Sequence, residues 1–183
     1  MAPRSDVLEL IRARGYERRD EPFQLTSGAT SYDYIDGKRA ISDGAALRMV
    51  AEAVVGVARE AAIDFDAVGG LTMGADPLAH AISLLTAKGW FSVRKERKQH
   101  GKEHLVEGSP LSRGTRVLLV DDVITTGKSI LQALDAIEAL DGVAVVLAVS
   151  IVDRGDRAKA ELSARGIRYE PLLTYRDLGI EPV

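Results

Sequence analysis

Two adjacent carboxylates, Asp121 and Asp122, follow a run of four apolar residues, and a short turn of hydroxyl residues and glycine comes after them. The segment reads RVLLVDDVITTGKS over residues 116–129. The apolar run predicts a buried strand, and ligands bind at the carboxyl ends of the strands in a parallel sheet. A turn that leads into a helix presents free backbone N–H groups to a phosphate. This order of groups suits a ligand that carries both hydroxyls and a phosphate, as ribose 5-phosphate does.

Two other interpretations of this segment were weighed. The ending GKS invites comparison with the nucleotide-binding P-loop, but the position five residues before Gly127 is Asp122, where that motif needs glycine. The two acids could instead serve as helix caps exposed to solvent. An adjacent pair at the end of a buried strand carries a cost of like charge that capping does not require, so the pattern favours a ligand site.

A basic cluster occupies residues 94–104, where five Lys or Arg accompany two Glu and two of the three histidines. Its local charge of +3 leaves −6 for the rest of a chain whose formal net charge is −3. A single basic cluster in an acidic chain predicts one anionic ligand rather than a long polyanion. The simpler alternative is a solvated charged loop. The cluster overlaps residues 96–112, about 17 residues of charge and glycine, and loops of that length are typically functional or disordered.

The elements that position these residues alternate along the chain. Apolar runs at 67–71, 90–93, 116–120, 143–152 and 167–173 predict strands, and helical periodicity predicts helices at 6–14, 43–62, 77–88, 128–140 and 157–165. Alternating helices and fully apolar strands predict an α/β fold with a parallel sheet covered on both faces. Residues 23–36 predict short strands and turns. Helix ends are expected at Gly15, Gly89 and Gly166.

The composition is that of an ordinary globular domain, with 183 residues, 46% hydrophobic residues and no cysteine. A chain of this kind predicts one domain that needs no metal or disulfide to fold. Without cysteine, a disulfide scaffold, a cysteine-ligated metal site and thiol chemistry are excluded. The longest apolar run, 143–152, is about half of the roughly 20 residues that a membrane helix needs. We therefore expect a cytoplasmic protein with no membrane segment and no nucleic-acid partner.

The segment VLLVDDVITTGKS resembles the signature of the type I phosphoribosyltransferases, which bind 5-phosphoribosyl 1-pyrophosphate (PRPP). Three further segments resemble one family in that group, the orotate phosphoribosyltransferases. They are FQLTSGATSYDYID at 23–36, GGLTMGADPLA at 69–79 and RKERKQHGKEHLVEG at 94–108. The resemblance implies a single domain over 1–183 with a parallel twisted sheet flanked by helices. It also implies a small N-terminal hood segment at 1–40 and a mobile catalytic loop at 96–112.

The activity that the resemblance implies is Mg²⁺-dependent transfer of phosphoribosyl from PRPP to orotate. The products are orotidine 5′-monophosphate and pyrophosphate, in the biosynthesis of UMP. The ion is expected mainly on substrate oxygens, with no dedicated metal ligands from the protein. The resemblance also implies a homodimer in which the loop reaches the neighbouring active site.

The resemblance assigns ribose hydroxyls to the acid pair, the 5-phosphate to the turn, and the pyrophosphate to the basic cluster, whose cations offset the charge that develops as pyrophosphate departs. It makes Lys98 and Asp122 the catalytic residues. The full set implied for PRPP is Arg94, Lys95, Lys98, His100, Asp121, Asp122, Val123, Ile124, Thr125, Thr126, Gly127, Lys128 and Ser129.

Orotate itself is assigned to Thr125 and Arg154. A planar guanidinium suits the orotate carboxylate because it can donate two parallel hydrogen bonds. The alternative is that Arg154 forms a surface ion pair with Asp153 or Asp156. A separate residue, His80, lies in an Ala/Leu-rich helix and is interpreted as structural.

The chain departs from the family pattern at two positions. Some members carry a lysine where this chain has Thr26, and others carry an aromatic–lysine pair where it has Thr72-Met73. No ligand is assigned at either place. Backbone N–H groups of 70–75 remain able to approach pyrophosphate, because Gly70 and Gly74 leave room.

Two alternative functions remain. The first keeps the chemistry and changes the acceptor to a purine or uracil, but a neutral base gives no reason for a carboxylate-pairing arginine. The second is a regulator that senses PRPP and binds nucleic acid. It lacks support, since no helix-turn-helix is recognisable and there is only one basic cluster.

Overall fold

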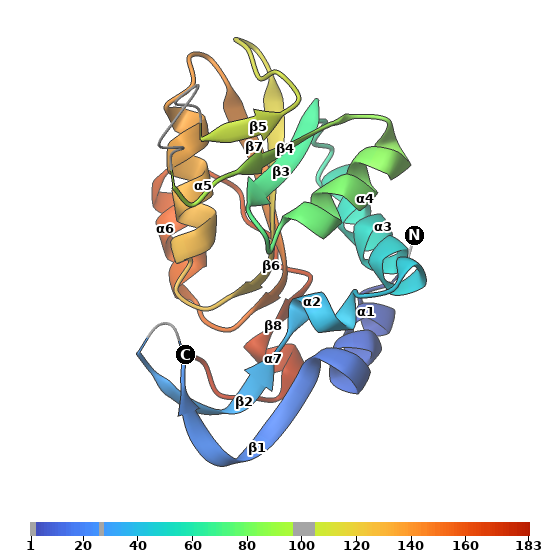
Figure 1. The fold of residues 1–183 in the computed structure, drawn as a ribbon, viewed down its shortest axis with the longest axis vertical. Helices are drawn as coiled ribbons and strands as arrows, with labels where there is room; N and C mark the ends of the chain where they lie inside the picture. The colour runs from blue at the N-terminus through green and yellow to red at the C-terminus, as the bar shows by residue number, and fades with distance from the viewer. Residues whose placement is uncertain (1–2, 26–27, 97–104) are drawn as a thin grey trace.

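The computed structural model describes residues 3–25, 28–96 and 105–183. Its centre is a six-stranded sheet in the order β5-β4-β3-β6-β7-β8, and a separate two-stranded sheet pairs β1 with β2 (Figure 1). Neighbouring strands run parallel except β5, which is antiparallel to β4. The prediction of an α/β fold with a mostly parallel sheet is therefore confirmed. The strands of the central sheet are β3 (Ala67–Leu71), β4 (Gly89–Val93), β5 (Val106–Gly108), β6 (Arg116–Ile124), β7 (Ala144–Asp153) and β8 (Leu173–Thr174).

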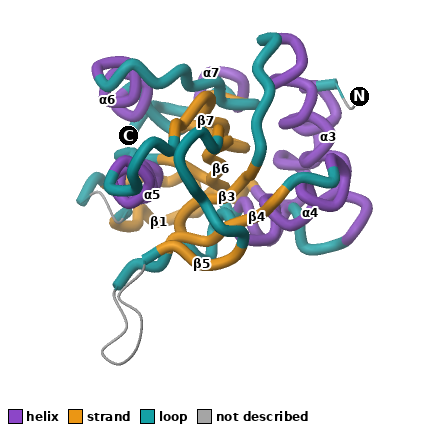
Figure 2. Tube along the Cα trace, turned by 90° about the horizontal axis from the view of Figure 1, so that it is seen from above, coloured by secondary structure: helices purple, strands orange, loops and turns teal. Residues whose placement is uncertain are grey.

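Helices cover both faces of this sheet. Figure 2 shows α3 (Gly44–Glu60) and α4 (Asp76–Thr86) on one side and α5 (Lys128–Glu138) and α6 (Arg157–Ala164) on the other. The start of α3 is set by Asp43, whose carboxylate accepts hydrogen bonds from the backbone N–H groups of Ala45 and Ala46, each at 3.0 Å. Among the described residues, no helix combines the length and the apolar character needed to cross a membrane.

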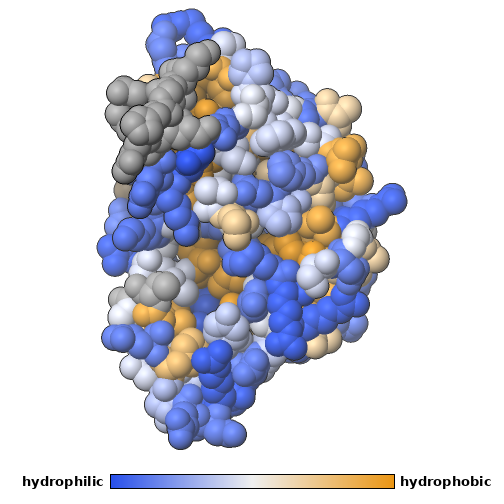
Figure 3. Space-filling view, viewed as in Figure 1, coloured by the Kyte–Doolittle hydropathy of each residue, from blue (hydrophilic) through white to orange (hydrophobic). Residues whose placement is uncertain are grey.

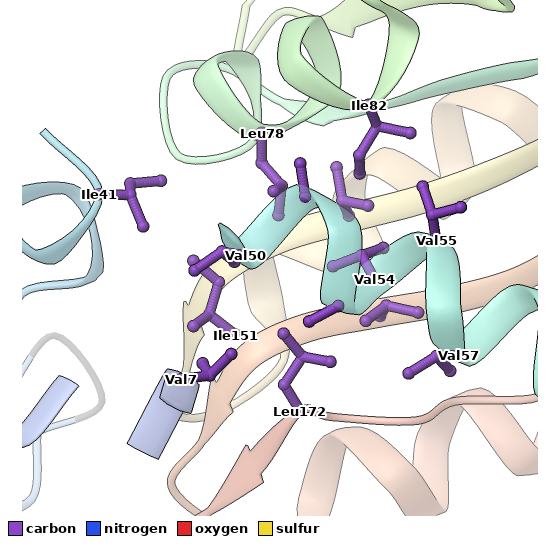
Figure 4. Close-up of a cluster of buried hydrophobic side chains, with 14 of the residues drawn as sticks. Val7, Ile41, Val50, Val54, Val55, Val57, Leu78, Ile82, Ile151 and Leu172 are labelled. Carbon is purple, nitrogen blue, oxygen red and sulfur yellow. The ribbon is translucent and has the colours of Figure 1, made fainter. Parts of the chain in front are cut away.

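Strand β6 separates two hydrophobic clusters. Its side chains alternate between the faces of the sheet, so that Leu118 and Val120 join the cluster under α3 and α4. Val117 and Leu119 join the cluster under α5 and α6. Figure 4 shows part of the first cluster, where Val50 and other valines of α3 pack among side chains of the sheet and of α4. Burial on both faces holds the end of β6 in a fixed position.

The N-terminal residues form a layer at the carboxyl ends of the strands. A helix, α1 (Arg4–Leu10), continues as a π-helical turn, η1 (Ile11–Gly15), into the hairpin of β1 (Tyr16–Gln24) and β2 (Thr30–Ile35). The short helix α2 (Gly37–Ala40) connects this hairpin to α3 (Figure 1). Near the end of the chain, α7 (Tyr175–Leu178) follows β8, and its Asp177 carbonyl accepts a hydrogen bond from Arg12 of η1 at 2.9 Å.

The first helical segment ends at Gly15 as predicted but without the predicted left-handed cap, and the helix end predicted at Gly89 is wrong. Gly15 does not take the left-handed conformation, because the chain passes through the π turn straight into β1. Helix α4 ends at Ala87, which has φ 55°, and Gly89 is the first residue of β4. The end of α6 at Gly166, with φ 74°, is confirmed.

Strand boundaries also differ from the prediction. Strand β6 continues past 120 to Ile124, since β7 is long enough to pair with it there. The strand predicted at 167–173 is reduced to β8 and an isolated bridge at Tyr169, because Pro171 has no N–H to donate to the ladder. The segment 96–112, predicted as a loop throughout, contains β5.

Candidate active site

The acid pair lies at the carboxyl end of β6 and inside the strand. Asp121 is 3% exposed and Asp122 is 9% exposed. The carboxylate of Asp121 accepts hydrogen bonds from the Ser129 hydroxyl at 2.5 Å and from the backbone N–H of Asp122 at 3.0 Å. Burial, and then the charge of Asp122, raise the pKa of Asp121 to about 7. A carboxyl group in this state changes its charge near neutral pH.

The turn after β6 leads into α5 as predicted. Gly127 has φ 79° and precedes Lys128, the first residue of the helix, whose N–H donates to the Thr126 hydroxyl at 3.4 Å. The first N–H groups of a helix have no partner within it, so this end is able to bind an anion. The side chain of Ile124 is 1% exposed and packs in the second core cluster. Ile124 is among the residues assigned to PRPP, and with its side chain buried it can contact a ligand only through its backbone.

The larger recess beside the acid pair has a volume of about 990 Å³. The turn of Thr72, Met73 and Gly74 forms one wall, and it closely approaches the acids. A Cβ atom at Gly74 would lie 2.7 Å from Asp122 Oδ1 and 2.9 Å from Asp121 Oδ1, so any larger residue there would have to displace the carboxylates. The recess is also lined by Lys38, Leu71, Asp76, His80, Trp90, Ser92, Arg94, Lys95, Glu96, Glu107 and Ser129.

Arg94 and Lys95 come directly after β4 and bring positive charge to this recess. Arg94 pairs with Glu107 of β5 at 3.2 Å, and among the described residues its buried Nε atom has no hydrogen-bond partner. The carbonyl of Lys95 accepts a hydrogen bond from Gln132 of α5 at 2.9 Å. The structure thus brings together the predicted acids, turn and first two cations. Lys98 and His100 lie outside the described residues.

A second, smaller recess of about 410 Å³ contains both residues predicted for orotate, Thr125 and Arg154. Its outer wall is the hairpin, where the rings of Phe23 and Tyr34 meet edge to face with centroids 5.6 Å apart. The Arg19 guanidinium lies 4.5 Å and 4.6 Å from the two ring centroids. The rings of Phe23 and Tyr34 at one wall and the guanidinium of Arg154 at another suit a planar acidic ring. We call this the base recess.

Arg154 is a buried cation without a counter-ion in the described part of the chain. It is 1% exposed, its Nη2 donates to the Ser31 hydroxyl at 3.1 Å, and its Nε has no partner. Asp156 pairs instead with Arg176 at 3.4 Å, and Asp153 accepts the N–H of Gly155. The alternative of a surface ion pair for Arg154 is therefore wrong.

Burial lowers the pKa of Arg154, which reflects the cost of keeping this charge away from water. The charge of Asp33 on β2 offsets part of this cost, but its carboxylate is bound by the Tyr16 hydroxyl and by Arg18, each at 2.9 Å, rather than by Arg154. An anionic ligand in the base recess would satisfy the guanidinium.

Sequence reasoning missed Lys38 and the aromatic pair of the hairpin. Lys38 lines both recesses, as does Asp122, and its ammonium lies 3.1 Å from Asp122 Oδ2. The only local signal was a lysine shortly after the segment 23–36. His80, interpreted as structural, is exposed on α4 and meets Trp90 edge to face with centroids 4.6 Å apart.

Within the described residues no group of three or more His, Asp or Glu side chains could hold a metal ion.

The face seen in Figure 3 is mostly hydrophilic, with hydrophobic surface in patches that include its middle.

A parallel sheet whose central strand carries two acids near its end, followed by a glycine turn into a helix, is typical of the phosphoribosyltransferases. The family model described as "Phosphoribosyl transferase domain" matches residues 39–166. Orotate phosphoribosyltransferase of Mycobacterium bovis is 41% identical over 183 residues, which is 97% of each chain. That of Methanothermobacter thermautotrophicus is 38% identical over 174 residues, or 95% of this chain and 93% of the relative.

The solved structures agree. The Mycobacterium tuberculosis orotate phosphoribosyltransferase in complex with PRPP superimposes with a TM-score of 0.79 at 36% identity, covering 97% of this chain and 99% of that one. The chain belongs to the orotate phosphoribosyltransferase family.

Proposed function

We propose that this enzyme transfers the phosphoribosyl group from PRPP to orotate and so forms orotidine 5′-monophosphate and pyrophosphate in the biosynthesis of UMP. The observation that carries the choice of acceptor is the buried guanidinium of Arg154 in the base recess, which forms no ion pair with the described residues and has an unpartnered Nε among them. A carboxylated base supplies the missing anion, whereas adenine, hypoxanthine and uracil do not. The names and the bound PRPP of the relatives support the same reaction.

The mechanism follows from the two recesses meeting at Asp122. Asp121 and Asp122 accept hydrogen bonds from the ribose hydroxyls, and residues 125–129 hold the 5-phosphate. The bond from C1 to the diphosphate oxygen breaks as a bond from C1 to the orotate nitrogen forms, and the proton lost from that nitrogen passes to the departing pyrophosphate or to water. The carboxylates favour the positive charge that develops on the sugar, and the cations of the larger recess favour the departing pyrophosphate. Lys98 is proposed to assist that departure.

Magnesium is proposed as the cofactor. The residues present fit an ion shared with substrate, because the larger recess offers the carboxylates of Asp121 and Asp122 beside space for diphosphate oxygens. The ion would neutralise charge on the pyrophosphate. Activity that persists in excess chelator would contradict this part.

A homodimer in the cytoplasm is the proposed state, with the loop 96–112 of each copy reaching the neighbouring active site. The exposed apolar side chains of Leu84 and Leu85 on α4 and of Trp90 on β4 support an interface there, because such residues gather at subunit contacts. Sedimentation should give twice the mass of the 183-residue chain.

The decisive experiment is the fall in orotate absorbance on mixing the enzyme with PRPP and Mg²⁺. Hypoxanthine, adenine and uracil serve as alternative acceptors. Turnover of orotate alone is expected. Turnover of another base without turnover of orotate would overturn the choice of acceptor and leave the phosphoribosyltransferase class standing.

A further inference from the structure

Lys38 is held against the acid pair by the way α2 packs. Asp36 begins this short helix by accepting the backbone N–H of Arg39 at 2.9 Å. A Cβ atom at Gly37 would lie 3.0 Å from both the Asp122 Cβ and the Val123 Cγ2 atoms, so the helix rests directly on β6. The next residue, Lys38, therefore extends along the acid pair.

The carboxylate of Asp122 lies between two different neighbours. Its Oδ1 atom faces Gly74, and its Oδ2 atom accepts a hydrogen bond from the Lys38 ammonium at 3.1 Å. The side chain of Lys38 remains 54% exposed. An ammonium has three donors, so two of them stay available on the open side of this contact. The charge of Asp122 raises the pKa of Lys38, which keeps the ammonium charged.

The larger recess has a place for such a cation. The turn facing the acids, Thr72-Met73-Gly74, carries no charged side chain, and Arg94 is paired with Glu107. In PRPP the diphosphate is attached at C1, next to the carbon that carries the 2-hydroxyl. If the acid pair binds the hydroxyls, the diphosphate begins within reach of a side chain that already touches Asp122.

We propose that Lys38 contacts the substrate directly: its ammonium holds Asp122 in the free protein and donates a hydrogen bond to a diphosphate oxygen in the complex. This inference rests on the proposed function, because it takes PRPP as the donor. Lys38 thereby supplies a cation that neither residue 72 nor residue 73 provides.

The test is calorimetric titration of the full chain, in Mg²⁺, with PRPP, ribose 5-phosphate and inorganic pyrophosphate as separate probes. Lys38→Met should lower the affinity for PRPP and for pyrophosphate at least tenfold and change the affinity for ribose 5-phosphate less than twofold. Lys38→Arg should recover most of the affinity. The control is Arg39→Met, which removes the same charge from the same helix and breaks only a 3.8 Å contact with Glu17.

Equal weakening of PRPP and ribose 5-phosphate would show that Lys38 acts only through Asp122, and unchanged affinities would show that it does not contribute; either result overturns the inference. Orotate turnover by the unmodified enzyme is measured separately. If that enzyme binds PRPP and does not turn over orotate, the proposed function fails while the titrations still decide on Lys38. If it does not bind PRPP, both fail.

Discussion

The two parts of the site are built in opposite ways. The acid pair, the turn and the start of α5 lie within residues 121–129, and the acids are fixed by pairing of β6 with β7. The base recess joins the hairpin to Arg154 through a hydrogen bond between residues 123 positions apart in the chain. Its hairpin pairs only with itself. One part is local and set in the central sheet, and the other is assembled from distant segments.

The difference separates two tasks. Holding a ribose phosphate needs fixed carboxylates and backbone N–H groups, which a central strand and a helix end provide. Choosing the base needs a surface that can vary without disturbing that core, and in the proposed function the hairpin and Arg154 have this role. Substitutions in the two parts should therefore affect different substrates.

The strongest test of this separation is Arg154→Met. The loss of a charge-assisted pair with orotate should lower kcat/KM for orotate about 100-fold, roughly 2.7 kcal/mol of barrier, while PRPP affinity changes less than twofold. Initial rates and calorimetry measure the two effects. Arg168→Met, at a 52% exposed side chain paired with Glu170, is the matched control. An equal loss in kcat/KM for orotate and in affinity for PRPP would show that the two parts of the site are not separate.

Lys98→Ala tests the proposed role of the basic cluster at residues 94–104. If Lys98 assists pyrophosphate departure, the turnover rate should fall at least tenfold, which is about 1.4 kcal/mol, with Tm unchanged. Stopped or continuous rate assays at saturating substrates measure it. A near-normal rate would remove Lys98 from the mechanism.

Asp121→Asn tests whether the acid pair costs stability. Burial raises the pKa of Asp121 to about 7, above its ordinary value, so the protonated carboxyl stabilises the fold. That stability is present at low pH and is lost as pH rises through about 7. Asparagine does not ionise. The variant should therefore gain about 3 °C in Tm at pH 8 and less at pH 5. A larger gain at pH 5 would reverse the sign and contradict the assignment.

Ser129→Ala should have the smallest effect. The hydroxyl donates to Asp121 at 2.5 Å and orients it, and a single hydrogen bond contributes about 1 kcal/mol. PRPP affinity should fall roughly threefold to fivefold, with no change for orotate. Titration with PRPP distinguishes two roles of the Ser129 hydroxyl. If it orients Asp121 the affinity falls, and if it only supports helix α5 the affinity is unchanged.

Much of the local part could be predicted from the sequence because its signals are adjacent residues. The apolar run, the two acids and the turn predicted the order strand, site, helix, and helical periodicity over 43–62 predicted α3 to within two residues at each end. The length of β6 was less predictable, since it depends on pairing with β7. In contrast, Pro171 was a sequence signal against a continuous strand at 167–173.

The base recess was predicted only in part. Arg154 and Thr125 were expected through the family resemblance, and the structure brings them together. Lys38 and the Phe23–Tyr34 wall were not expected, because contacts between α2, the hairpin and β6 depend on packing across many residues. The roles of all these residues stay predictions until the substitutions are made.

The strand order also affects how the molecule behaves beside copies of itself. Long strands, β6 and β7 with 9 and 10 residues, occupy the interior of the sheet, whereas the edge strands β5 and β8 have only 3 and 2 residues. An exposed edge is a template on which another chain can add a strand, and short edges offer few unpaired N–H and C=O groups. This arrangement keeps the two long strands, β6 with the acid pair and β7 that ends one residue before Arg154, away from the positions where aggregation begins.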